Sequence, residues 1–219
     1  MPTLDGPRVP PADGGPARQL VVLLHGVGAD GADLINLAEP FAAALPGAAF
    51  VAPNAPEPCD MAPFGHQWFS LQVRTPERLL LGTQAAAPLL DAFLDAELAR
   101  HGLDDGALAV VGFSQGTMMA LYAVPRRARA CAGLLCYSGA LLAGERLAAE
   151  ARAKPPILLV HGDADDVVPV AAMQHAVQSL QAAGFDVEGR VRPGLPHGID
   201  PGGIDLGVAF LRRCFGTAL

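Results

Sequence analysis

The stretch Val110–Ala120 reads VVGFSQGTMMA, and it decides the fold of this chain. The apolar run from Leu108 to Val111 predicts a buried strand. The small and apolar residues from Thr117 to Val124 predict a helix, which Pro125 ends. The residues between these two runs fit the pattern Gly-x-Ser-x-Gly around Ser114. Between a strand and a helix, this pattern indicates a nucleophile elbow.

The spacing of the pattern has a steric origin. The serine must stand at the tip of a strained turn if its hydroxyl is to clear the sheet. The residues two before and two after it come close to neighbouring backbone, which favours Gly112 and Gly116. The following helix points its N-terminus at Ser114 and favours negative charge there. In the alternative interpretation Ser114 is only a turn residue before a helix.

Composition and charge narrow the class of protein. A chain of 219 residues with 51% hydrophobic and 17% charged residues suits one globular domain. The net charge of -7 argues against nucleic-acid binding. No apolar stretch reaches the roughly 18 residues of a membrane span. The first 18 residues lack the apolar core of a secretion signal, so we expect a cytoplasmic protein.

The four cysteines are scattered along the chain and include no Cys-x-x-Cys pair. We expect them to be free and buried thiols. The sequence shows no spacing typical of metal ligands, and we expect neither a metal ion nor a cofactor.

Short apolar runs alternate with helical stretches from residue 19 onward. Strands are expected at 19–24, 48–52, 108–111, 130–137, 156–160 and 187–191. Helices are expected at 33–45, 77–100, 117–124, 144–153, 170–183 and 204–215. This alternation predicts an α/β fold with a mostly parallel central sheet and helices on both faces. Residues 1–18 are expected to form a tail or an edge strand, and residues 19–219 a single domain.

A glycine-rich loop follows the first of these strands. His25 to Gly31 contains three glycines beside a strand end, which suggests unusual backbone angles. The segment is a candidate oxyanion loop, which would offer a backbone N–H to a developing negative oxygen. A plain turn explains the same residues.

A long segment, 53–76, contains five prolines and the only tryptophan of the chain. Loops of this length in compact domains are usually functional or disordered. Its aromatic residues argue against disorder, so we expect a loop that folds over the site and lines a pocket. Ordinary packing over the core is the alternative.

A serine hydroxyl needs a base within hydrogen-bond reach, and the base needs an acid that fixes its tautomer. His197 is the only histidine late in the chain, in a loop rich in proline and glycine after the last strand. It therefore suits the order Ser, Asp, His that is typical of an α/β-hydrolase. For the acid, Asp163, Asp165 and Asp166 compete, and spacing alone does not choose among them.

These motifs together resemble the phospholipase/carboxylesterase family of α/β-hydrolases, whose members include acyl-protein thioesterases. The matching stretches occur in the family's order over nearly the whole chain. They are LHGVGAD at 24–30, APNAP at 52–56, QWF at 67–69, GFSQG at 112–116, HGDAD at 161–165 with VP at 168–169, and HG at 197–198. The serine motif alone is not specific for this family, but the matching stretches taken together are.

The resemblance implies roles for individual residues. It places the acid at Asp165, with Asp166 as the alternative, and the oxyanion donors at the backbone N–H groups of Val27 and Gln115. The family often has leucine where Val27 stands, a change that a backbone donor tolerates. The resemblance also places Trp68 beside the acyl pocket. The other residues that we expect in this pocket are Phe69, Met61, Phe64 and Val168.

The expected activity is that of a carboxylesterase that cleaves short to medium acyl esters through Ser114, Asp165, His197 and an acyl-enzyme. Lysophospholipase or acyl-thioesterase activity with the same triad is one alternative, although residues 57–64 depart from the thioesterase members. A non-catalytic α/β-hydrolase that binds a ligand is another. The expected partner is a small acyl ester. The apolar composition and the resemblance are compatible with a homodimer, for which the sequence identifies no surface.

Overall fold

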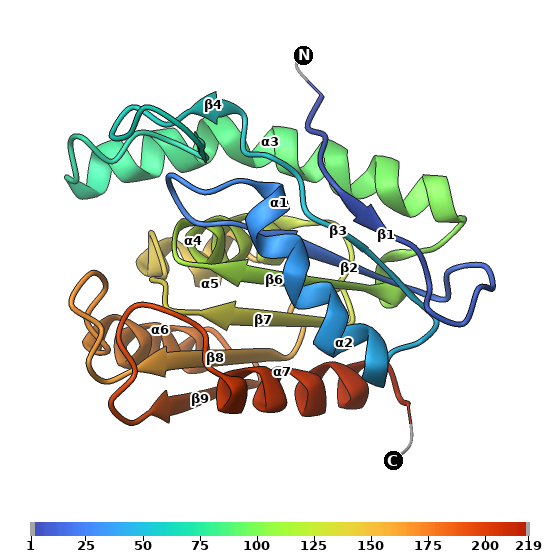
Figure 1. The fold of residues 1–219 in the computed structure, drawn as a ribbon. Helices are drawn as coiled ribbons and strands as arrows, with labels where there is room; N and C mark the ends of the chain where they lie inside the picture. Colours follow the sequence, from blue (N-terminus) through green and yellow to red (C-terminus); the bar gives the residue numbers. More distant parts are fainter. Residues whose placement is uncertain (1–2, 218–219) are drawn as a thin grey trace.

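The structure is a computed structural model that describes residues 3–217. Its centre is a seven-stranded sheet with the strand order β1-β3-β2-β6-β7-β8-β9 (Figure 1). The strands are β1 (Arg8–Val9), β2 (Gln19–Leu24), β3 (Ala48–Val51), β6 (Leu108–Phe113), β7 (Gly133–Tyr137), β8 (Ile157–Gly162) and β9 (Val187–Arg192). Neighbouring strands are parallel except for β1, which pairs antiparallel with β3. The predicted, mostly parallel sheet is confirmed.

Helices cover both faces of this sheet (Figure 1). Alternate residues of a strand point to opposite faces, so Leu20, Val22 and Leu24 of β2 enter one core while Val21 and Leu23 enter the other. The first core is covered by α3 (Pro76–His101), α4 (Gln115–Ala123), α5 (Leu147–Glu150) and α6 (Ala171–Ala182). The second is covered by α1 (Gly31–Leu34), α2 (Ala38–Ala44) and α7 (Pro201–Cys214). Single 3-10 turns lie at Ile35–Leu37, Asp105–Ala107, Val124–Arg126 and Gly144–Arg146.

Most predicted elements differ from the observed ones by one to three residues at an end; α7, for example, begins at Pro201 and not at residue 204. The helix expected at 33–45 is divided into α1, a 3-10 turn and α2. Pro40 has no N–H to donate, so it fits the first turn of a new helix better than the interior of a continuous one. The expected strand at 130–137 begins only at Gly133, and the expected helix at 144–153 ends at Glu150.

The long segment 53–76 contains a small hairpin, β4 (Glu57–Pro58) paired antiparallel with β5 (His66–Gln67), which the sequence analysis did not predict. Strands of two residues with a proline in one of them carry no readable periodicity. At the N-terminal end, β1 is an edge strand within the segment predicted as a tail or an edge strand. Residues 1–2 and 218–219 of the predicted segments lie outside the described residues.

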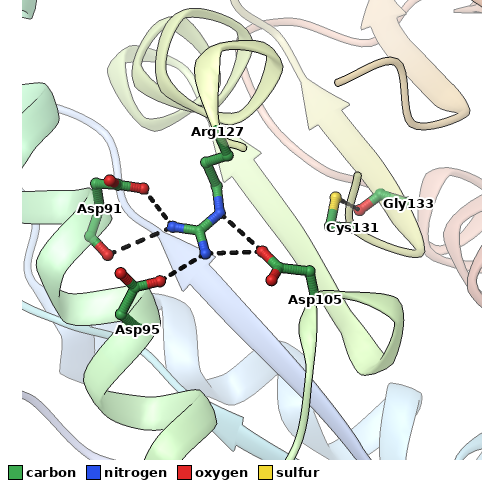
Figure 2. Close-up of polar contacts among 6 residues, drawn as sticks. All are labelled: Asp91, Asp95, Asp105, Arg127, Cys131 and Gly133. Atoms are coloured by element: carbon green, nitrogen blue, oxygen red, sulfur yellow. Dashed lines mark hydrogen bonds and ion pairs between the residues drawn. The ribbon is translucent and has the colours of Figure 1, made fainter. Parts of the chain in front are cut away.

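One buried arginine ties the loop after α4 to the long helix α3 (Figure 2). The guanidinium of Arg127 contacts the carboxylates of Asp91 and Asp95 on α3 and of Asp105 before β6. The Nη2 atom lies 2.7 Å from Asp95 Oδ1 and 2.8 Å from Asp105 Oδ1. Burial opposes the charge, but the hydrogen bonds to Asp95 and Asp105 outweigh it and raise the pKa of Arg127 above its ordinary value.

Within the described part of the chain, no helix combines the length and the apolar character needed to cross a membrane. The four cysteines are free. Cys131 and Cys136 are buried as predicted, whereas Cys59 and Cys214 are partly exposed.

Candidate active site

Three loops at one edge of the sheet carry the predicted catalytic residues. Ser114 follows β6, Asp165 follows β8 and His197 follows β9. These strands are parallel, so their carboxyl ends meet at the same edge (Figure 1). In sheets of this kind, ligands bind beyond the carboxyl ends of the strands.

Ser114 occupies a strained turn between β6 and α4. Its φ of 53° lies in the left-handed region, which non-glycine residues rarely adopt. The flanking glycines are required sterically. A Cβ atom added at Gly116 would lie 1.9 Å from the carbonyl oxygen of Leu24, and one added at Gly112 would lie 2.6 Å from the backbone nitrogen of Thr117. The local geometry is that of the predicted nucleophile elbow.

A continuous chain of hydrogen bonds joins the three side chains. His197 Nε2 lies 3.0 Å from Ser114 Oγ, and His197 Nδ1 lies 2.7 Å from Asp165 Oδ2. Because an ionised carboxylate only accepts hydrogen bonds, Nδ1 carries the proton and Nε2 is left to accept one from the serine. This is the arrangement that a general base needs in order to activate a hydroxyl.

The structure distinguishes the three aspartates that compete for the acid position. Asp163 Oδ1 accepts a hydrogen bond from the N–H of Gly194 at 2.6 Å, and the side chain of Asp166 is exposed. Only Asp165 contacts His197 among these three.

The Asp165 carboxylate is held from both sides. Its Oδ1 accepts from the N–H groups of Val167 at 3.0 Å and Val168 at 2.8 Å. Its Oδ2 lies 3.2 Å from Nε2 of the buried His161, which also donates to the carbonyl of Val168 at 2.7 Å. Burial alone would raise the pKa of Asp165, but the bonds from His197, Val168 and Val167 outweigh it and hold the pKa below its usual value. Asp165 is therefore ionised at neutral pH.

His25 fixes the candidate oxyanion loop and is itself uncharged. It is fully buried, and its Nε2 accepts a hydrogen bond from the N–H of Ala55 at 2.9 Å. Burial lowers the pKa of His25. Trp68 Nε1 donates to the carbonyl of His25 at 3.0 Å. The first histidine of the chain thus anchors the loop and does not face the serine as a base.

Two backbone N–H groups remain unused beside Ser114. Within residues 3–217, neither the N–H of Val27 nor that of Gln115 donates to a protein acceptor. Gln115 opens α4, where the first N–H groups of a helix have no intrahelical partner. The loop of Val27 is close to the nucleophile, because a Cβ added at Gly26 would lie 3.1 Å from Ser114 Cβ. These are the two donors that the resemblance implies.

The side chain of Gln115 has a second role that the sequence analysis missed. Its Oε1 accepts from the N–H of Trp68 at 2.9 Å, and its Nε2 donates to the carbonyl of Phe69 at 2.7 Å. The residue after the serine therefore clamps the long segment 53–76 onto the elbow. Trp68 and Phe69 precede Gln115 by 47 and 46 positions in the sequence, and only the fold brings them into contact with it. No local sequence pattern therefore indicates this role.

The five predicted pocket residues do not all line the same cleft. Trp68 and Phe69 are buried and line a cleft of about 600 Å³ together with residues of α3. Met61 and Phe64 are 52% and 73% exposed on the β4–β5 hairpin and are not among the residues that line this cleft. Val168 lies in the acid loop, where its N–H and its carbonyl hold Asp165 and His161.

A second cleft, of about 470 Å³, was not predicted; one of its lining residues, Phe113, packs against the ring of His197. Six apolar residues line it: Leu34, Leu37, Pro40, Phe113, Ile199 and Ile204. The sequence offered one clue, since Phe113 precedes Ser114 and Ile199 follows His197 by two residues.

Comparison with known proteins identifies the family. The Phospholipase/Carboxylesterase family model matches residues 8–215, so the chain belongs to this family. Esterase YpfH of Escherichia coli (strain K12) is 29% identical over 197 residues, which cover 90% of this chain and 83% of that protein. A probable carboxylesterase of Oryza sativa subsp. japonica is 35% identical over 199 residues, which cover 83% of this chain and 72% of that protein.

A solved structure agrees with this assignment. The crystal structure of esterase PE8 is similar with a TM-score of 0.93 at 43% identity, covering 97% of this chain and 99% of that one. The fold is that of the α/β-hydrolases, and the chain is a carboxylesterase-type hydrolase that acts on ester bonds.

Proposed function

We propose that this protein hydrolyses short to medium acyl esters with Ser114 as nucleophile, His197 as base and Asp165 as the acid that orients the base. The observation that carries the proposal is the unbroken chain of hydrogen bonds from Ser114 Oγ through His197 to Asp165. The two unused N–H groups of Val27 and Gln115 support it, since ester hydrolysis needs donors for an oxyanion.

The reaction proceeds in two halves. His197 Nε2 takes the proton from Ser114 Oγ as this oxygen bonds to the ester carbonyl carbon. The carbonyl oxygen becomes an oxyanion, which the N–H groups of Val27 and Gln115 stabilise. His197 then gives its proton to the leaving alcohol oxygen as the carbon–oxygen bond breaks. Water repeats the sequence on the acyl-enzyme, which releases the acid and restores the serine.

Hydrolysis of p-nitrophenyl esters from acetate to laurate tests this function. Ser114→Ala removes the nucleophile, and we expect turnover to fall by roughly 10⁴ to 10⁶. Ser179→Ala on α6 makes the same chemical change outside the site and is the matched control. A fluorophosphonate should label the wild type and the control but not Ser114→Ala.

Two results would contradict the proposal. Wild-type protein that is as inactive as Ser114→Ala on every ester and resists the fluorophosphonate would favour a ligand-binding protein without catalysis. Wild-type protein that is labelled but hydrolyses only thioesters would retain the triad and change the substrate class.

A further inference from the structure

A mostly apolar cleft lies next to the catalytic residues and shares one side chain, Phe113, with the surroundings of His197. We call it the α1–α7 cleft, because its walls come from the α1–α2 region on one side and from Ile199 and Ile204 at the start of α7 on the other. Its volume of about 470 Å³ lies in the range of small-molecule pockets. Of the residues that line it, Asp33 alone is charged. The cleft therefore suits a neutral, apolar group and disfavours an anionic one.

Phe113 connects this cleft to the catalytic residues. Its ring lies 5.0 Å from the ring of His197, centroid to centroid, at an angle of 42°. A Cβ added at Gly26 would lie 3.3 Å from Phe113 Cδ1 and 3.1 Å from Ser114 Cβ. The Phe113 ring thus flanks both the base and the loop beside the nucleophile. Phe113 is therefore the residue that the cleft and the catalytic residues have in common.

The chemistry of ester cleavage assigns the two ends of the substrate. In the tetrahedral intermediate, the oxyanion must face the N–H groups of Val27 and Gln115. The alcohol oxygen must face His197 Nε2, because it receives its proton from that atom. The carbon chain of the alcohol therefore continues on the His197 side. The acyl chain therefore extends in the direction that neither the oxyanion nor the alcohol occupies.

We propose that the α1–α7 cleft is the leaving-group subsite and binds the apolar carbon chain of a neutral alcohol. This inference rests on the proposed function, since it needs His197 to protonate the leaving oxygen. It makes the enzyme selective for the alcohol half of its substrate, independently of the acyl half. Phe113, Ile199 and Ile204 are then specificity residues that contact the alcohol.

Two ester series separate the two halves of the substrate. Methyl, butyl and hexyl acetate share one acetyl-enzyme and differ only before the alcohol leaves, so the alcohol subsite shows in kcat/KM. Methyl acetate, hexanoate and octanoate share one leaving group and differ in the acyl chain. In the acetate series we expect kcat/KM of the wild type to rise by about fourfold for each methylene that the cleft buries.

Ile204→Trp fills the cleft from the α7 side. We expect it to lower the ratio of kcat/KM for hexyl acetate to that for methyl acetate by about tenfold or more, which corresponds to two buried methylenes. The ratio of methyl octanoate to methyl acetate should change much less. Leu37→Trp fills the cleft from the opposite wall and repeats the test should Ile204→Trp not fold. Ala209→Trp places the same side chain on the exposed face of α7 and is the control.

The outcomes distinguish the subsite from the activity. If Ile204→Trp and Leu37→Trp change the acyl series instead, the cleft binds the acyl chain and the proposal is overturned. If both variants fold and change neither series, the cleft binds no part of the substrate and the proposal is likewise overturned. A wild type that cleaves neither series and resembles Ser114→Ala refutes the proposed function itself.

Discussion

At the scale of single residues, the assignment of the acid depends on one contact. Asp163, Asp165 and Asp166 are chemically identical and lie within four positions of one another. Only Asp165 reaches Nδ1 of His197, at 2.7 Å. Its other oxygen is occupied by two backbone N–H groups, so the carboxylate cannot rotate away from the histidine without losing them.

This geometry predicts a large difference between two neighbouring substitutions. Asp165→Asn preserves size but offers an amide where His197 needs an acceptor, and in another serine triad the same change lowers kcat by about 10⁴. We expect a loss of similar order here. Asp166→Asn makes the identical change one residue later, on an exposed side chain, and should leave kcat nearly unaltered. The measurement is kcat on p-nitrophenyl acetate.

The same two variants also show which result would assign the acid to a residue other than Asp165. If Asp166→Asn abolished activity and Asp165→Asn did not, the acid would be Asp166, the alternative that the family resemblance left open. Equal losses in both variants would indicate that the loop itself, and not one carboxylate, had been damaged. Circular dichroism of both variants separates this case from a catalytic defect.

Some residues of the candidate site lie in local sequence patterns, whereas others are brought together only by the fold. The proximity of Ser114 and His197 could be predicted, because each lies in a local sequence pattern that places it in a loop beyond the carboxyl end of a strand. Spacing alone left the acid open among three carboxylates of one loop, the family resemblance pointed to Asp165, and only the fold shows which carboxylate reaches His197. The clamp of Gln115 on Trp68 and the wall that Phe113 forms beside His197 depend on contacts across the fold.

At the scale of elements, alternating apolar runs predicted the strands of the central sheet from β2 onward and their helices. The prediction was less accurate where elements are short. The β4–β5 hairpin has two residues in each strand, and the broken helix at 31–44 contains a 3-10 turn. Such pieces are stabilised by tertiary contacts more than by their own periodicity. The edge strand β1 belongs with them, since Arg8 pairs with the buried Glu97 of α3 at 2.7 Å.

The contact between α3 and the loop after α4 offers an element-scale prediction. Arg127→Met removes the cation that three aspartates surround and leaves Asp105, whose side chain is only 14% exposed, without its partner (Figure 2). Breaking a buried ion pair typically costs 3–5 kcal/mol. Asp91 and Asp95 are half-exposed or more and recover water, so we expect a loss of roughly 2–3 kcal/mol.

Urea unfolding of Arg127→Met measures this loss, and Asp105→Asn completes a double-mutant cycle. Coupling should be strong between Arg127 and Asp105 and weak between Arg127 and Asp95. The control is Arg129→Met, because Arg129 lies two residues later and is exposed. A variant Arg127→Met that is as stable as the wild type would show that desolvation of the cluster cancels its attraction.

At the scale of the whole molecule, helices cover both faces of the sheet, and the loops with Ser114, Asp165 and His197 lie at the carboxyl ends of its strands. The same burial places ionisable groups where their pKa values shift. Burial lowers the pKa of His25 from 6.5. For Glu97, burial would raise the pKa, but Arg8 and Arg100 outweigh it and lower the pKa from 4.5. For Asp165, burial would likewise raise the pKa, but the hydrogen bonds from His197, Val168 and Val167 outweigh it and lower the pKa from 3.8.

The pKa shifts of His25, Glu97 and Asp165 all make the folded protein more stable as the pH rises. In each case the unfolded chain binds a proton more readily than the folded one, so the free energy of unfolding rises with pH. His25 contributes stability that is complete above its unfolded pKa of 6.5 and lost as the pH falls below it. Glu97 and Asp165 contribute stability that is complete above about 4.5 and lost as the pH falls through their lowered values. The protein should therefore lose stability in two acid steps.

Glu97→Gln tests the second step, because it removes a carboxylate that is 2% exposed and bonded to Arg8 and Arg100. We expect it to lower the free energy of unfolding at pH 7 by roughly 1–3 kcal/mol and to flatten its dependence on pH below 4.5. The step below 6.5 should persist, since it belongs to His25. Glu39→Gln changes an exposed carboxylate and should leave both steps unchanged. If Glu97→Gln kept the wild-type slope below 4.5, acid instability would come from other carboxylates, and the pairing of β1 with α3 would not be what protons disrupt.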